Sequence, residues 1–92
     1  MTGEAARLSD AQVQEELLKI PGWELREGQI TRLYKLPDFK AALAFVNQVG
    51  ELAEAADHHP DIDIRYSKVR LTLSTHSAGG LTSKDFSLAA QL

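Results

Sequence analysis

A chain of 92 residues with 43% apolar residues and a net charge of -3 has the composition of a small globular protein. The lack of cysteine excludes disulfides, thiolate metal ligands and thiol catalysis, and the ten scattered Lys and Arg side chains disfavour nucleic acid as a direct partner. Without a run of about 18 apolar residues or a signal-peptide core, we expect a cytoplasmic protein with no membrane span.

The length of the chain also indicates how many domains it forms. We expect residues 1–7 to form a flexible tail and residues 8–92 to fold as one domain. A domain of this size buries only about 60% of its unfolded surface. Such a thin core would gain from association with further copies of the chain.

The first predicted helix begins at Ser9, because a glutamine three residues later completes a capping box. Its apolar positions are expected to continue to Ile20, before a Pro-Gly pair ends the helix. Two short strands are predicted next, over residues 23–26 and 29–36. Glu27-Gly28 between them is suited to a two-residue hairpin turn.

A long second helix is predicted after Pro37-Asp38. Its apolar residues recur at helical spacing, at Ala42, Phe45, Val46, Val49, Leu52, Ala53 and Ala56. His59 precedes Pro60, and the residue before a proline avoids the helical region. We therefore expect His58 to be about the last helical residue and His59 the first extended one. Glu54, four residues before His58, would then share its helix face.

Two alternating runs predict strands over residues 62–66 and 69–74, joined by a turn at Ser67-Lys68. Thr82 then caps a last helix, with Asp85 at the third helical position, where a capping-box acid needs no catalytic role. The order α-β-β-α-β-β-α predicts an α+β domain. We expect one four-stranded antiparallel sheet with the three helices packed on one face.

The three histidines lie between positions 58 and 76. If the last two strands pair as a hairpin, the chain reverses once and His76 returns close to His58 and His59. Imidazole titrates near neutral pH, so such a group can supply both an acid and a base. His76 has the parity of the polar residues of its strand, so either the strand twists or ends before His76 or the site lies off the helix-covered face. Glu54 is placed to hold the tautomer of His58.

Other interpretations of these residues remain open. Surface His-His-Pro segments occur without function, and Trp23 belongs to a type found more often in a core than in a ligand site. Tyr66 continues the Ile62 and Ile64 face of its strand, so we expect it to pack in the core. Glu54, His58 and His76 also form a donor set that would suit zinc or iron, although HExxH and related signatures are missing. A metal-dependent hydrolase therefore competes with a metal-free acid–base enzyme.

The spacing of these residues resembles that of the pterin-4a-carbinolamine dehydratases. The family pattern is an acid, three residues, His-His-Pro, an aromatic residue, a third histidine and an aspartate at set distances. In this chain the pattern reads Glu54, His58-His59-Pro60, Tyr66 after five residues, His76 after nine more and Asp85 after eight more. The resemblance extends over nearly the whole chain, from about Leu8 onward. Because relatives form dimers and tetramers, the resemblance implies a homodimer or homotetramer.

The resemblance implies a lyase that removes water from 4a-hydroxytetrahydropterin to give quinonoid dihydropterin, in tetrahydropterin recycling. No metal or redox cofactor is implied, because the chemistry needs only an acid for the leaving hydroxyl and a base for the N5 proton. We assign the roles as follows: His58 and His76 as the acid–base pair, His59 for pterin binding, Glu54 to position His58, Asp85 to hold His76 or its loop, and Trp23 and Pro60 as supporting residues. A dimerisation module with a regulatory role, keeping the fold with idle chemistry, is the alternative.

Overall fold

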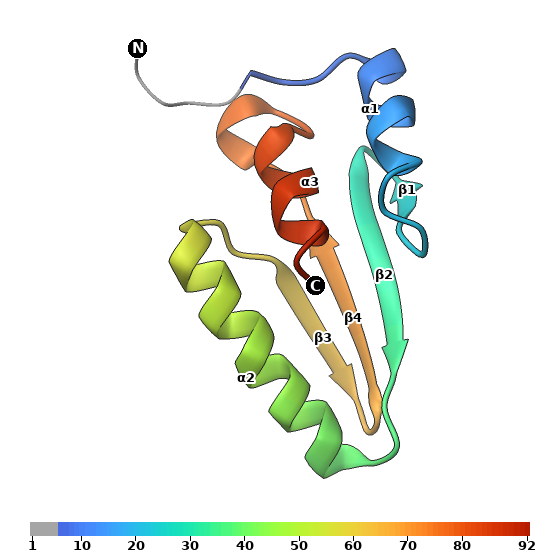
Figure 1. The fold of residues 1–92 in the computed structure, drawn as a ribbon, viewed down its shortest axis with the longest axis vertical. Coiled ribbons are helices and arrows are strands. Elements are labelled where there is room, and N and C mark those ends of the chain that lie inside the picture. The colour runs from blue at the N-terminus through green and yellow to red at the C-terminus, as the bar shows by residue number, and fades with distance from the viewer. Residues whose placement is uncertain (1–5) are drawn as a thin grey trace.

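The computed structural model describes residues 6–92, so most of the predicted tail lies outside the described residues. The order α-β-β-α-β-β-α and the α+β class are confirmed (Figure 1). The elements are α1 (Asp10–Leu17), β1 (Glu24–Arg26), β2 (Gln29–Lys35), α2 (Phe39–Ala56), β3 (Asp61–Arg65), β4 (Lys68–Leu73), a short 3-10 turn η1 (His76–Ala78) and α3 (Ser83–Ala89).

The four strands form one antiparallel sheet in the order β1-β2-β4-β3. The central strands β2 and β4 pair over the full length of β4, from Ile30 opposite Leu73 to Lys35 opposite Lys68. Helices α2 and α3 lie over one face of the sheet, while α1 lies beside β1 and β2 at one end (Figure 1). The end of α2 and the start of α3 are therefore brought to the same end of the sheet.

The core lies between the central strands and the helices. Its most deeply buried large apolar side chains are Ile30, Val49, Val69, Leu71, Leu73 and Leu88. Full burial of a side chain of this kind stabilises the fold by about 1.5–3 kcal/mol. Helix α2 is fixed at its start by Asp38, whose carboxylate accepts a 2.8 Å hydrogen bond from the Ala41 amide. The core thus fixes both helices that later supply site residues.

The predicted start of the first helix is confirmed, but its predicted end at Ile20 is wrong. Ser9 and Gln12 form the expected reciprocal capping box, whereas α1 ends at Leu17. Leu18 is 83% exposed, and Ile20 reaches the core from the turns that follow. The apolar residues of this segment therefore continue beyond the helix into the following turns, so their spacing does not mark the end of the helix.

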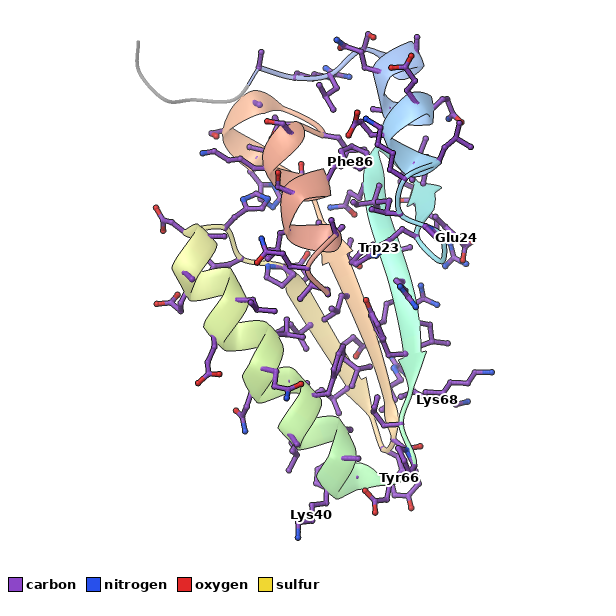
Figure 2. The ribbon with its side chains drawn as sticks, in the orientation of Figure 1. Trp23, Glu24, Lys40, Tyr66, Lys68 and Phe86 are labelled. Atoms are coloured by element: carbon purple, nitrogen blue, oxygen red, sulfur yellow. The ribbon has the colours of Figure 1, made fainter. Side chains whose placement is uncertain are left out.

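One of the two hairpin turns lies where the sequence predicts it, and the other lies one residue earlier. Glu27 and Gly28 have φ of 50° and 77°, as the predicted β1–β2 turn requires. Between β3 and β4 the turn residues are Tyr66 and Ser67, one position earlier than predicted. Tyr66 has φ of 56° and is 72% exposed, so the expectation that it packs in the core is wrong. Figure 2 shows it at the end of the sheet away from α3.

Strand β3 forms an edge of the sheet and departs from the half-buried strand that was predicted. All five of its residues are exposed, including Ile62 and Ile64, at 38% and 36%. These isoleucines share a face of the sheet with the buried Leu71 and Val69 of β4, but they lie at the margin of that face. None of the helices in residues 6–92 is long and apolar enough to span a membrane.

Candidate active site

The helix that leads to the histidines closes two residues earlier than the sequence suggests. Helix α2 ends at Ala56, and Asp57 takes the left-handed conformation with φ 50° and ψ 42°. The Asp57 and His58 amides bond back to the carbonyls of Glu54 and Ala53, each at 3.1 Å, which is the Schellman closure. His58 is therefore outside the helix, and the prediction that it shares a helix face with Glu54 is wrong.

His58 instead forms a buried pair with Asp85, the third residue of α3. Its Nε2 lies 2.6 Å from the Asp85 Oδ1. The His58 side chain is 11% exposed and that of Asp85 is fully buried. Asp85 was predicted to hold His76 or its loop; in the structure its direct histidine partner is His58. The left-handed turn at Asp57 sends the chain out of α2 toward this carboxylate.

Three donors surround the buried carboxylate of Asp85. Its Oδ2 accepts from the Thr82 amide at 2.9 Å and from the Thr75 hydroxyl at 2.8 Å, while Oδ1 contacts His58. The Thr82 bond belongs to the capping box at the start of α3, where Lys84 also donates its amide to the Thr82 hydroxyl. Asp85 therefore both caps the helix and binds a histidine, two roles that the sequence had left as alternatives.

This arrangement fixes how His58 presents its ring. Because an ionised carboxylate can only accept hydrogen bonds, His58 donates from Nε2. A neutral His58 then keeps its lone pair on Nδ1, which is the atom left to exchange a proton with a ligand. A buried carboxylate that orients one imidazole nitrogen so that the other can act is the arrangement found in many acid–base sites.

His59 forms a second carboxylate pair, on the surface. Its Nε2 contacts Glu54 Oε2, and the two side chains are 58% and 77% exposed. Glu54 therefore contacts His59, and the prediction that it partners His58 is wrong. The two consecutive histidines use the same nitrogen for a carboxylate and leave Nδ1 free in each ring.

His76 directly follows a residue that contacts the buried pair. Strand β4 ends at Leu73, which is the first of the two predicted alternatives: the strand ends before His76. His76 is exposed and begins η1. Thr75, the preceding residue, binds the same Asp85 carboxylate as His58. The return of the His76 side chain itself toward His58 stays a prediction. A cavity of ≈ 700 Å³ lies beside His76, but His58 and His59 do not line it.

The remaining predicted site residues lie as follows. Trp23 is 7% exposed and belongs to the core cluster, as its residue type favoured. Pro60 is half-buried directly before β3. Thr75 was missed by the sequence reasoning, and Thr82 was recognised only as a cap. A Ser-Thr-His run gives no sign that its threonine will bind a carboxylate ten residues further on.

The donor set proposed for a metal is not assembled in the described part of the chain. Glu54 contacts His59, and the Nε2 of His58 is bound to Asp85. Residues 6–92 contain no cluster of three or more His, Cys, Asp or Glu side chains placed to hold a metal ion. The described residues instead form two separate imidazole–carboxylate pairs, one buried and one exposed.

Fold and site together define an α+β domain with a buried histidine–aspartate pair suited to proton transfer. The chain belongs to the family described as Pterin 4 alpha carbinolamine dehydratase, which matches residues 6–92. A protein of Chloroflexus aurantiacus named "Putative pterin-4-alpha-carbinolamine dehydratase" is 58% identical over 86 residues, covering 94% of this chain and 92% of its own. A namesake from Roseiflexus castenholzii is 57% identical, covering 96% and 95%.

A solved structure extends the likeness to three dimensions. It is the crystal structure of a transcriptional coactivator/pterin dehydratase from Brucella melitensis, with a TM-score of 0.88 and 37% sequence identity. The match covers 92% of this chain and 93% of that one. Sequence and fold therefore place this chain in the family over nearly its whole length.

Proposed function

We propose that this protein dehydrates 4a-hydroxytetrahydropterin to quinonoid dihydropterin and water by histidine acid–base catalysis, in support of tetrahydropterin recycling. The observation that carries the proposal is the buried His58–Asp85 pair, which holds one imidazole in a single orientation with Nδ1 free. The chain's membership of a dehydratase family supports the choice of substrate.

The reaction breaks one carbon–oxygen bond and moves two protons. The hydroxyl on C4a takes a proton from an acid and leaves as water, while a base removes the proton from N5. The electron pair of the N5–H bond then forms the N5=C4a double bond. Each positioned proton-transfer group of this kind contributes about 10²–10⁴-fold in rate. Both groups must exchange protons near neutral pH, which suits imidazole.

In this proposal His58 and His76 are the acid–base pair, with the pterin ring lying between them. Asp85 fixes the His58 ring, replacing Glu54 in the role predicted from the sequence. His59, exposed and paired with Glu54, would bind the pterin from the solvent side. Pro60 disfavours the helical conformation for His59, the residue directly before it.

The test is a stopped-flow dehydration assay with synthetic 4a-hydroxytetrahydropterin, measured against the uncatalysed reaction and repeated with a chelator. We expect His58→Gln and His76→Gln each to lower kcat by about 10²-fold or more. Lys40→Gln, an exposed charge change in the first turn of α2, is the control. Near-normal rates in both histidine variants would contradict the assignment. Loss of wild-type activity on chelation would contradict the metal-free mechanism.

We further propose that the chain associates with copies of itself through β3 and the adjoining edge of α2. The support is the exposed strand edge with Ile62 and Ile64, together with Phe39 at 47% and Leu43 at 41% exposure on α2. Unpaired strand edges with apolar neighbours favour pairing. Sedimentation velocity should show a dimer or tetramer, which Ile64→Lys dissociates and Leu18→Lys leaves intact. A concentration-independent monomer would contradict the proposal.

A further inference from the structure

Thr75 is a buried threonine at the centre of the hydrogen bonds that surround Asp85. It is 6% exposed, and its hydroxyl lies 2.8 Å from both the Asp85 Oδ2 and the Thr82 Oγ1. Thr82 and Asp85 are both 0% exposed. Among the described residues, Thr75 is thus the only side chain on the His76 segment that reaches the carboxylate bound to His58.

The direction of these hydrogen bonds follows from the number of protons. Thr75 has one hydroxyl proton, and the Asp85 carboxylate can only accept, so Thr75 donates to Asp85. Thr82 must then donate to Thr75, while its own oxygen accepts from the Lys84 amide. The chain of donors runs from Thr82 through Thr75 to Asp85, and each hydroxyl is satisfied as donor and acceptor.

The backbone of Thr75 is held as firmly as its side chain. Its amide donates to the Gly80 carbonyl at 3.0 Å, and its carbonyl accepts from the Ala78 and Gly80 amides at 3.0 and 3.3 Å. These bonds close the loop that carries His76. Because Thr75 precedes His76 directly, a shift of this residue moves the backbone from which the His76 side chain projects.

We propose that Thr75 is a positioning residue that couples the two histidines of the acid–base pair. Its hydroxyl locks the Asp85 carboxylate that orients His58, and its backbone sets the start of η1, where His76 lies. The catalytic meaning of this coupling rests on the proposed dehydration; the link from Thr75 to the His58 ring stands without it. Misplacement by about 1 Å at a reacting centre can cost 10²-fold in rate.

The first experiment compares Thr75→Val, which keeps the shape and loses the hydroxyl, with Thr75→Ser, which keeps the hydroxyl. Thr31→Val is the matched control, because Thr31 is also buried, at 3% exposure, and its hydroxyl bonds the Leu71 carbonyl in the middle of the sheet. We expect Thr75→Val to lower kcat by about 10- to 100-fold with little change in KM. Thr75→Ser should keep kcat near the wild-type value, and Thr31→Val should keep it within about threefold of that value.

The second experiment places Thr75→Val in an Asp85→Asn background. If Thr75 acts through Asp85, the double variant should be no slower than Asp85→Asn alone. Rate losses that multiply would show that Thr75 acts independently of Asp85 and would overturn the proposal. So would a Thr75→Val variant that matches Thr31→Val in rate.

The third experiment reads the His58 ring without any substrate. Nitrogen-15 NMR of the full chain should show a single Nε2–H tautomer for His58, with an Nε2 proton protected from solvent exchange. Thr75→Val should shorten that protection, and Thr75→Ser and Thr31→Val should keep it. Unchanged protection in Thr75→Val would overturn the coupling. A protected wild-type signal without dehydration activity would count against the proposed function alone.

Discussion

Two adjacent histidines of this chain each pair with a carboxylate, yet the two pairs lie in opposite environments. His58 and Asp85 are almost wholly enclosed, whereas His59 and Glu54 face solvent. After the left-handed Asp57 the chain leaves α2 without regular secondary structure up to Pro60, and the two histidines there contact carboxylates on different helices. One short turn therefore provides an oriented buried imidazole and an exposed one.

The difference in burial decides what each pair contributes. An exposed pair gains little, about 0–1 kcal/mol, because water and salt screen it and two side chains lose freedom. A buried carboxylate that loses its partners leaves a polar group without hydrogen bonds and destabilises the fold strongly. We therefore expect the stability of the fold and the orientation of the His58 ring to depend on the buried pair. The exposed pair should affect contact with the ligand only.

The largest effect on stability is expected from Asp85→Ala. The change removes the capping-box acid and leaves the His58 ring, the Thr75 hydroxyl and the Thr82 amide without their acceptor. We expect the free energy of unfolding to fall by about 3–5 kcal/mol, measured by urea denaturation. A loss below about 1 kcal/mol would mean that the buried pair is no more important than an exposed one.

A smaller loss is expected from Asp57→Val, which tests the turn that separates the pairs. A β-branched side chain at φ 50° is disfavoured by about 1–2 kcal/mol. Asp57→Gly, which accepts that conformation freely, is the control and should be at least as stable as the wild type. Equal stability of the two variants, or NMR spectra in which Asp57→Val leaves both imidazoles unmoved, would contradict this role of the turn.

Tyr34→Phe tests a buried polar atom that has no partner, in contrast to Asp85. The Tyr34 hydroxyl is buried and finds no hydrogen-bond partner among residues 6–92. Its removal should stabilise the fold by about 1 kcal/mol at neutral pH, measured by urea denaturation. A destabilised variant would show that the hydroxyl has a partner in solution.

The same residue gives a pH dependence. Burial raises the pKa of Tyr34 above its ordinary value, and the nearby Arg32 offsets the rise only in part. Above about pH 10 the folded chain keeps a Tyr34 proton that the unfolded chain releases. The contribution of Tyr34 to stability is therefore constant below about pH 10 and falls as the pH rises further. Urea denaturation between pH 8 and 11.5 should show a shallower fall in Tyr34→Phe. Parallel curves for both proteins would contradict the assignment.

The smallest effect is expected from Glu54→Gln, which neutralises the exposed partner of His59. The free energy of unfolding should change by less than about 0.5 kcal/mol. Glu51→Gln, three residues earlier on α2 and also exposed, is the matched control. If Glu54→Gln raised KM for the pterin and Glu51→Gln did not, His59 would be confirmed as a ligand contact. A large fall in stability would remove the contrast between the two pairs.

Local chemistry explains what the sequence could predict. Ser9 with Gln12, Glu27 with Gly28, and Thr82 with Asp85 are each short-range patterns, and the structure contains all three. The partners of the histidines could not be found in this way. The spacing of Glu54 and His58 carries meaning only inside a helix, and α2 had already ended at Ala56.

Long-range contacts account for the other differences. Alternation cannot tell a strand residue from the first residue of a turn, so Tyr66 was predicted to pack in the core. Thr75 gained its role from a hydroxyl that meets a helix cap after the chain reverses. Only the family spacing linked Glu54, the histidines and Asp85 before the structure, and it did so without showing which carboxylate meets which imidazole.

The position of Asp85 on a short helix has a consequence for how activity is lost. Helix α3 spans only Ser83–Ala89, and such elements can detach in brief local openings while the sheet stays folded. Each opening would release the His58 ring. Catalysis should therefore fail on warming before the sheet melts, and amide exchange at the start of α3 should track the remaining activity more closely than exchange in β2 or β4.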